Sequence, residues 1–267
     1  MQNKLFLNGF HLKLIGMLSM FIDHFCVYII PETSSVYLPL RCIGRISFPI
    51  FCFLLCEGMD HSSNKLKYLL RILCLSIFMD ILTLILFKQY LGCPLTILFL
   101  GGLTIYFLKK PKYFKLLGII PFCIGILTGC EFFPIRAQYG FYGIILILIF
   151  YFSRIFSQKI ISLISKNDYE YDNYIHNYYH YLHFALLISL YTCYTLLTVF
   201  FQNQIQYIFT QNDVVFTIQS YSIISCIFLF FYNGKRGYNK TWFKYGCYLF
   251  FPLHFVLIYL LSLIIHF

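Results

Sequence analysis

The chain has 267 residues, of which 60% are hydrophobic, 21% aromatic and only 11% charged. Because a soluble domain carries about 25% charged residues, this composition excludes a water-soluble globule and predicts an integral membrane protein. The formal net charge of +10 would also suit nucleic acid, but the basic residues form short clusters between apolar stretches. That distribution is typical of anchors at an anionic lipid surface, so we expect membrane lipid as a partner and no nucleic acid.

The 11 cysteines indicate neither a disulfide framework nor a metal site. Most of them lie inside apolar runs, where a thiol behaves as a small buried hydrophobic group. The sequence has no CxxC pair and no Cys/His spacing of the kind that binds zinc, so we predict no metal. No small-residue cleavage site follows the first apolar run, and we expect that run to be retained as a membrane span.

A helix crosses the hydrocarbon core with about 20 mostly apolar residues. In chain order, windows of this kind fall at residues 10–30, 38–58, 68–90, 94–108, 114–132, 137–156, 181–201, 214–232 and 245–266. The sequence therefore predicts an all-α polytopic membrane bundle of about nine transmembrane helices, with residues 1–267 as one domain. The fourth window is short and contains Gly101 and Gly102, so we expect a broken or tilted helix there.

Residues 157–180 form the one long polar connection and predict an interfacial loop rich in Tyr and His. In and beside it, His176, His180 and His183 have the spacing of one helix face. That spacing would suit a metal if the segment were helical, but a tyrosine-rich belt at the membrane interface is the interpretation we favour.

Most of the 20 Lys and Arg residues lie in alternate connections between the apolar windows. Because basic loops stay on the cytoplasmic side of a membrane, we expect a cytoplasmic N-terminus and an external C-terminus. The expected location is the cytoplasmic membrane of a bacterium, crossed several times.

Charged residues inside the apolar windows are costly and indicate a partner or a function. The first window contains Lys13, Asp23 and His24. Lys13 and His24 are separated by three helical turns plus about 20°, so both face the same way, roughly 16 Å apart along the axis. That separation is close to the length of a phosphopantetheine arm.

The other windows add groups at matching depths. Arg41 and Arg45 lie one turn apart in the second window, Asp80 lies in the third, and His254 follows Pro252 in the last. We therefore expect one layer in the membrane and one basic mouth at its cytoplasmic side. The layer contains Asp23, His24, Arg45, Asp80 and His254, and the mouth contains Lys13, Arg71, Lys235, Arg236 and Lys244.

This arrangement would suit an acyl-CoA whose phosphates meet the mouth and whose thioester reaches a histidine. A neutral imidazole at His24 can take a proton from an attacking hydroxyl or amine, and Arg45 can stabilise the developing oxyanion. Other interpretations stay open. Asp23 and Arg45 could form a buried ion pair that fixes packing, His254 could bond to a carbonyl that Pro252 frees, and the basic residues could be membrane anchors.

Several blocks of the sequence resemble the TraX family: HLKLIGMLSMFIDHF, LRCIGRISFPIFCFLLCEGMDHSSNKLKYLLRIL, FYNGKRG and KYGCYLFFPLHFVLI. The resemblance is dense over the first 75 residues and clear over about the last 40. The spacing of Lys13 and His24 is also similar to the basic-x10-His signature of a wider superfamily of transmembrane acyltransferases. The chain departs from the TraX pattern at Phe251, where the family has Tyr, and at Gly92, where it has Asn.

The resemblance implies a membrane acetyltransferase with acetyl-CoA as its donor. Its acceptor would be a hydroxyl or amine at or beyond the outer side of the membrane, on a pilin-like N-terminus, a cell-surface glycan or a small molecule. By position it implies His24 as the catalytic histidine, and from the charged layer we expect Asp23, Arg45 and His254 to be catalytic residues beside it. Acetyl-CoA would be bound by Lys13, Arg41, Glu57, Asn64, Tyr68, Arg71, Asn233, Lys235, Arg236, Tyr245 and Tyr248.

Two other classes remain open from the sequence. A proton-coupled transporter or flippase also needs intramembrane Asp, His and Arg, although the two halves of this sequence show no repeat of broken helices. A non-catalytic scaffold would leave the alignment of Lys13 with His24 unexplained.

Overall fold

The computed structural model describes residues 5–88, 90, 92–130, 133–200 and 218–265, and almost all of them are helical. Within these residues, six helices are long and apolar enough to cross a membrane, which makes this a multi-pass membrane protein. Their bounds are α1 Gly9–Ile29, α2 Tyr37–Gly44 continued by α3 Ser47–His61, α4 Lys65–Phe87, α8 Gly140–Ile164, α10 Tyr179–Phe200 and α14 Thr241–Ile265.

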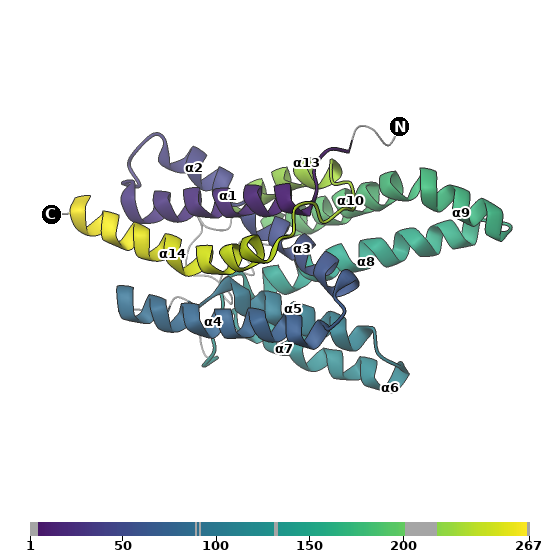
Figure 1. Cartoon of the computed structure of the whole chain (residues 1–267), viewed down its shortest axis with the longest axis horizontal. Helices are drawn as coiled ribbons and strands as arrows, with labels where there is room; N and C mark the ends of the chain where they lie inside the picture. The colour runs from purple at the N-terminus through teal and green to yellow at the C-terminus, as the bar shows by residue number, and fades with distance from the viewer. Residues whose placement is uncertain (1–4, 89, 91, 131–132, 201–217, 266–267) are drawn as a thin grey trace.

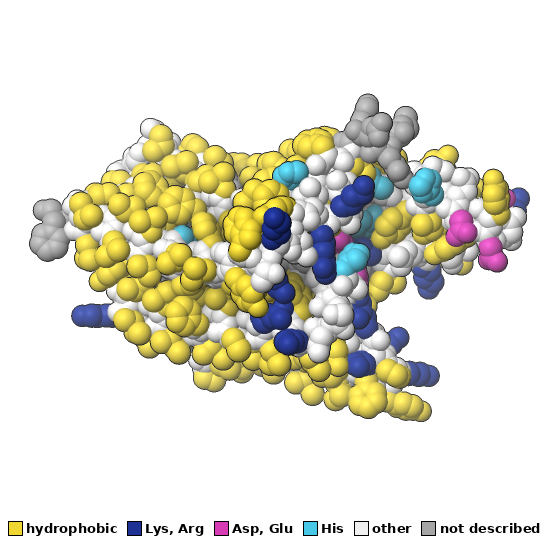
Figure 2. All heavy atoms as spheres, viewed as in Figure 1, with side chains coloured by type: hydrophobic (Ala, Val, Ile, Leu, Met, Phe, Trp, Pro, Cys, Tyr) yellow, Lys and Arg dark blue, Asp and Glu magenta, His cyan; other side chains and the backbone are white. Residues whose placement is uncertain are grey.

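The helices form a bundle in which α1 and α14 lie side by side and begin close together (Figure 1). Helix α4 packs against α14, and α3 packs between α1 and α8. The described chain therefore starts and finishes toward opposite ends of the bundle (Figure 1). Figure 2 shows hydrophobic side chains covering the ends of α1, α4 and α14, whereas Lys and Arg gather toward the end that carries α6 and α9.

The expected count of about nine spans is not confirmed. Three windows contain only shorter helices: α5 at Pro94–Leu108, α7 at Ile119–Leu127, and the segment Ser220–Phe230, which comprises η3 Ser220–Ile224 and α13 Ser225–Phe230. Helix α5 has the predicted bounds, and of the two expected alternatives the broken helix is wrong, because α5 runs through both Gly101 and Gly102. Part of the window 214–232 lies outside the described residues.

The window 114–132 is divided into α6 Lys112–Lys115, η2 Leu116–Gly118 and α7. Pro121 explains the division, since its ring nitrogen has no hydrogen to donate to the carbonyl of Leu117. The helix then tightens into the 3-10 turn that ends at Gly118.

The predicted interfacial loop at residues 157–180 is wrong, because the segment is helical. Helix α8 continues to Ile164, and α9 then occupies Asp168–Asn177. The side chain of Asn167 caps α9 by accepting from the Glu170 amide at 2.8 Å, as expected for Asn at a helix start. The three histidines are divided between α9 and α10, and His180 donates to the Phe230 carbonyl at 2.9 Å.

Candidate active site

Two cavities of similar size lie in the bundle. The first, which we call the histidine cavity, has a volume of about 530 Å³, and its lining includes Asp23, His24, Arg41, Arg45 and Asp80. The second, the basic cavity, has a volume of about 500 Å³, and its lining includes Lys13, Arg71, Arg236 and Lys244. The structure thus places four of the five residues of the predicted layer, all except His254, on one cavity and most of the predicted mouth on the other.

Asp23 holds two arginines from the next transmembrane segment. Its Oδ1 pairs with Arg41 at 2.6 Å, and its Oδ2 pairs with Arg45. Asp23 is only 6% exposed and Arg45 only 5%, so the pairing offsets the cost of placing these charges in the membrane. His24 Nδ1 is bonded to His254 and the Asp23 oxygens to the two arginines, so no hydrogen bond joins Asp23 to His24 among the described residues.

A break between α2 and α3 allows this pairing. Pro49 cannot donate to the carbonyl of Arg45, four residues earlier, and α2 accordingly ends at Gly44 while α3 begins at Ser47. Gly44 faces the Asp23 side chain so closely that a Cβ atom there would overlap the carboxylate. The small residue is therefore needed for the approach of α2 to α1.

The arginine cluster continues into a polar wall. Arg45 donates to the Tyr139 hydroxyl at 3.2 Å and to Gln219 Oε1 at 3.3 Å. Beside it, the hydroxyls of Tyr142, Tyr191 and Ser222 are joined by hydrogen bonds of 2.6 to 3.0 Å. Of this wall, Tyr139, Tyr142 and Gln219 lie on the lining of the histidine cavity and supply it with neutral hydrogen-bonding groups.

His24 and His254 form a direct pair. His24 Nδ1 lies 2.8 Å from His254 Nε2, and His254 Nδ1 lies 2.9 Å from the Phe250 carbonyl. A carbonyl only accepts, so His254 Nδ1 must donate, and a neutral His254 then accepts at Nε2. His24 Nδ1 is consequently the donor within the pair, which leaves Nε2 of a neutral His24 with a free lone pair. The hydrogen-bond chain thus defines both tautomers.

Asp80 faces the same cavity from α4. Its Oδ1 is buried, with no hydrogen-bond partner among the described residues. A carboxylate in that state is costly in a membrane. Asp80 is therefore a candidate either for contact with a substrate or for proton exchange.

The basic cavity is lined by helices α1, α3, α4, α5 and α14 and by the loop before α14. Lys13 reaches it from α1, Arg71 from α4 and Lys244 from α14. No acidic partner is paired with these three side chains or with Arg236 in the part of the chain that the structure describes. The cavity also contains four residues implied by the resemblance: Glu57, Tyr68, Tyr245 and Tyr248.

Backbone pairing with the N-terminal segment positions the loop at residues 231–237. The Leu7 amide donates to Phe231, the Asn233 amide donates to Leu7, and the Gly9 amide donates to Lys235. Gly237 has a φ of +68°, and a Cβ atom there would overlap Asn8, the residue that caps α1. Glycine is therefore required at this position, and the resulting turn directs Arg236 into the basic cavity.

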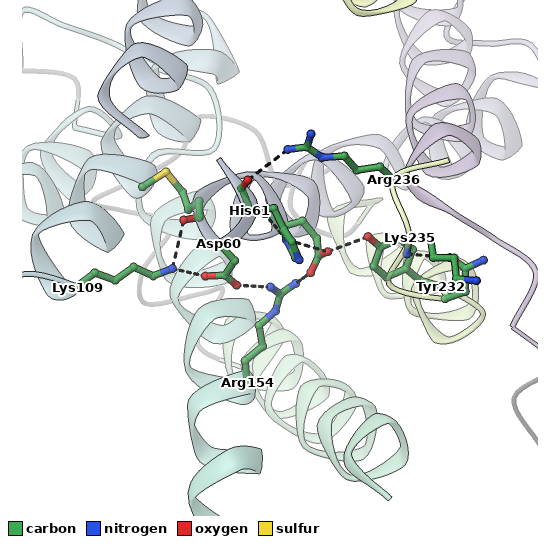
Figure 3. A network of polar contacts seen from close by, with 10 residues as sticks. Asp60, His61, Lys109, Arg154, Tyr232, Lys235 and Arg236 are labelled. Carbon is green, nitrogen blue, oxygen red and sulfur yellow. Dashed lines mark hydrogen bonds and ion pairs between the residues drawn. The ribbon is translucent and has the colours of Figure 1, made fainter. Parts of the chain in front are cut away.

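An ion network closes the same end of the bundle (Figure 3). Arg154 bonds to Asp60 at 2.6 Å and also to Glu57, while Lys109 reaches Asp60 from α5. The Tyr232 hydroxyl donates to the second oxygen of Glu57 at 2.8 Å. Burial, reinforced by the Glu57 carboxylate, raises the pKa of Tyr232 and keeps its hydroxyl a donor. Glu57 therefore brings little unpaired negative charge to the basic cavity.

Four residues with a predicted role at acetyl-CoA lie elsewhere. Arg41 lines the histidine cavity rather than the basic cavity. Asn64 is exposed and caps α4 by accepting from the Lys67 amide at 2.9 Å. Asn233 accepts from the Lys235 amide at 3.0 Å. Like Asn64, both Asn233 and Lys235 lie off the lining of the basic cavity.

The family model described as TraX protein matches residues 8–166, more than half of the chain. The chain belongs to the TraX family. The matched segment includes Lys13, His24, Arg45 and Asp80, whereas the TraX-like blocks that carry Arg236 and His254 lie beyond it.

Two relatives differ in how much of the chain they match. The probable fimbrial assembly protein FimC, serogroup H1, of Dichelobacter nodosus is 25% identical over 97% of both chains. An uncharacterized protein of Rickettsia prowazekii is 35% identical over 37% of each chain. No solved structure matches this TraX protein.

Proposed function

We propose that this TraX protein is a membrane acyltransferase that moves an acetyl group from acetyl-CoA to a hydroxyl or amine. The observation that carries the proposal is the His24–His254 hydrogen bond of 2.8 Å, which leaves a lone pair on Nε2 of His24, a residue on the lining of the histidine cavity. A general base needs such a nitrogen within reach of the proton that it removes.

His24 acts as the base in the proposed reaction. Its Nε2 takes the proton of the acceptor while the acceptor oxygen or nitrogen bonds to the acetyl carbonyl carbon. The carbon–sulfur bond of the thioester then breaks, and His24 returns the proton to the departing thiolate, so the transfer consumes no net proton. His254 stabilises the charged His24 by accepting from its Nδ1. The Asp23–Arg41–Arg45 cluster carries one excess positive charge that favours the developing oxyanion.

The basic cavity supports acetyl-CoA as the donor. Four basic side chains without acidic partners in the described residues surround it, and α14 begins beside it at Thr241. Phosphate groups bind well to such side chains and to the exposed amides at a helix start. Acetyl-CoA would supply the activated acetyl group, and the apolar wall of Leu54, Leu75 and Leu98 would contact the uncharged arm that joins the phosphates to the thioester.

The orientation follows from the charge distribution. Lys and Arg gather at the end of the bundle that holds the basic cavity (Figure 2), and we place that end in the cytoplasm, where acetyl-CoA is available. The N-terminus is then cytoplasmic, the membrane is the cytoplasmic membrane of a bacterium, and the histidine cavity receives the acceptor from the outer side. The FimC relative, a probable fimbrial assembly protein, makes a pilin-like N-terminus one candidate acceptor; a cell-surface glycan or a small molecule would meet the same base.

The test uses the full chain in detergent, with acetyl-CoA as donor and hexylamine or hexan-1-ol as probe acceptors. Release of free CoA should fall at least about 100-fold in His24→Ala and stay unchanged in His176→Ala, a histidine on α9. Equal CoA release by the His24 variant and the unmodified protein, with both folded, would overturn the proposal.

A transporter is a second candidate, favoured by the buried Oδ1 of Asp80, which has no hydrogen-bond partner among the described residues. Such a carboxylate can bind and release a proton during a transport cycle. Proton uptake into vesicles that Asp80→Asn abolishes and His24→Ala preserves would favour transport over acyl transfer.

A further inference from the structure

The ring of Phe251 separates the two cavities. Among the described residues, Phe251 alone lines both of them. The basic side chains open into one cavity and His24 opens into the other, so an acyl group held by the first must pass this ring to reach the second. Phe251 is only 8% exposed, which indicates that the ring fills the passage and does not stand in an open channel.

Neighbouring groups restrict the ring on two sides. The ring of Phe51 lies 5.9 Å from it between centroids, and the His254 imidazole lies edge-on at 6.1 Å. Phe51 in turn packs against the backbone at Gly16, where a Cβ atom would lie 3.2 Å from its ring. The Phe51 ring therefore has little space into which it can move away from Phe251.

The backbone of Phe251 belongs to an interrupted part of α14. Pro252 follows directly inside the helix, and its ring nitrogen cannot donate to the Tyr248 carbonyl. Phe251 lines both cavities directly before this proline, and His254, two residues after the proline, bonds to His24.

We propose that Phe251 selects the acyl group by size, admitting acetyl to His24 and excluding branched or longer groups. This inference rests on the proposed function. The bonds that form and break are those of acetyl transfer: the thioester carbon–sulfur bond is exchanged for a bond to the acceptor, and His24 moves the proton to the thiolate. Phe251 takes no part in these steps and acts only on the path of the acyl group.

The first measurement compares the rates of CoA release from acetyl-CoA and isobutyryl-CoA. One extra or missing methylene in a hydrophobic pocket changes the specificity ratio by about 10-fold to 200-fold. Phe251→Ala should therefore raise kcat/KM for isobutyryl-CoA relative to acetyl-CoA at least about tenfold. Phe251→Tyr keeps the ring and should preserve the ratio of the unmodified protein. Ile72→Ala removes apolar volume from the basic cavity alone and should preserve it too.

The second measurement does not need turnover. The thioethers S-ethyl-CoA and S-isobutyl-CoA cannot transfer a group, and their affinities can be compared by thermal shift. The unmodified protein should favour S-ethyl-CoA about tenfold or more, and Phe251→Ala should bind both equally.

The outcomes separate this inference from the function on which it rests. Turnover that depends on His24, with ratios that Phe251→Ala leaves unchanged, would overturn the selector and leave the enzyme intact. Binding that discriminates by size without any CoA release would support the selector and overturn the acyltransferase. Equal affinity of the unmodified protein for the two thioethers, or no affinity for either, would overturn the selector.

Discussion

The histidine cavity and the basic cavity have nearly equal volumes, but they differ in whether their charged side chains form ion pairs. In the first, Asp23 is bonded to two arginines, and a polar wall surrounds Arg45. In the second, Lys13, Arg71, Arg236 and Lys244 have no acidic partner among the described residues. Paired charge keeps a geometry in place, whereas unpaired charge of one sign is ready to meet an anion from solution. Substitutions should therefore affect stability in the first cavity and ligand affinity in the second.

The largest expected effect is the loss of stability when the ion pairs of the histidine cavity are broken. Asp23→Asn leaves two buried arginines without their carboxylate, and loss of one partner of a buried pair costs about 3–5 kcal/mol. The midpoint of chemical denaturation in detergent should fall strongly.

Asp168→Asn is the matched control, because Asp168 is exposed in the first turn of α9. Its loss should cost at most about 1 kcal/mol through the helix dipole. A stability of Asp23→Asn equal to that of Asp168→Asn would show that the cluster is not structural.

The next effect concerns the histidine pair. His254→Phe removes the acceptor of the His24 Nδ1 hydrogen and should lower kcat roughly 100-fold, at the lower end of what a positioned base contributes. His254→Gln places an amide oxygen near the position of Nε2 and should restore part of the activity. A residue with a packing role alone would show the reverse order, with Phe better tolerated than Gln, and steady-state kinetics on folded protein distinguishes the two results.

Substitutions in the basic cavity should change the affinity for the ligand. Arg236→Ala removes a cation from the lining of the basic cavity and should raise the KM for acetyl-CoA about tenfold, the loss expected for a charge-assisted contact with phosphate. The neighbouring Lys235 is exposed and off that lining, so Lys235→Ala should leave KM within about twofold. Equal changes in both variants would indicate a diffuse surface charge instead of a site.

Much of this contrast could be predicted from residue spacing. The separation of Lys13 from His24 on one helix face placed them at different depths, and the structure assigns them to different cavities. The histidine cavity was harder to predict, because the pairing of Asp23 with Arg41 depends on the break before Ser47. Pro49 was a signal of that break, but the apolar window around it suggested one continuous helix.

Other features had weaker signals in the sequence. The polar composition of residues 157–180 concealed two helix segments, although Asn167 before acidic residues is a helix start signal. In the sequence, Phe251 differs from its surroundings only as a departure from the family pattern. Its place between two cavities depends on how α1, α3 and α14 pack, and a single sequence does not show that packing. The pairing of Arg154 with Asp60 joins residues almost a hundred positions apart and had no local signal.

The smallest effect tests a residue that the family resemblance assigned to acetyl-CoA. Asn64 caps α4 through the Lys67 amide, so Asn64→Ala should lower stability by about 1 kcal/mol and leave the KM for acetyl-CoA unchanged. Asn64→Ser keeps a capping oxygen and should recover most of the loss. If instead KM rises in both variants while stability holds, Asn64 contacts the ligand directly, and the basic cavity must extend beyond the walls that the structure gives it. In that case the ligand-binding residues would include the start of α4 as well as Arg71.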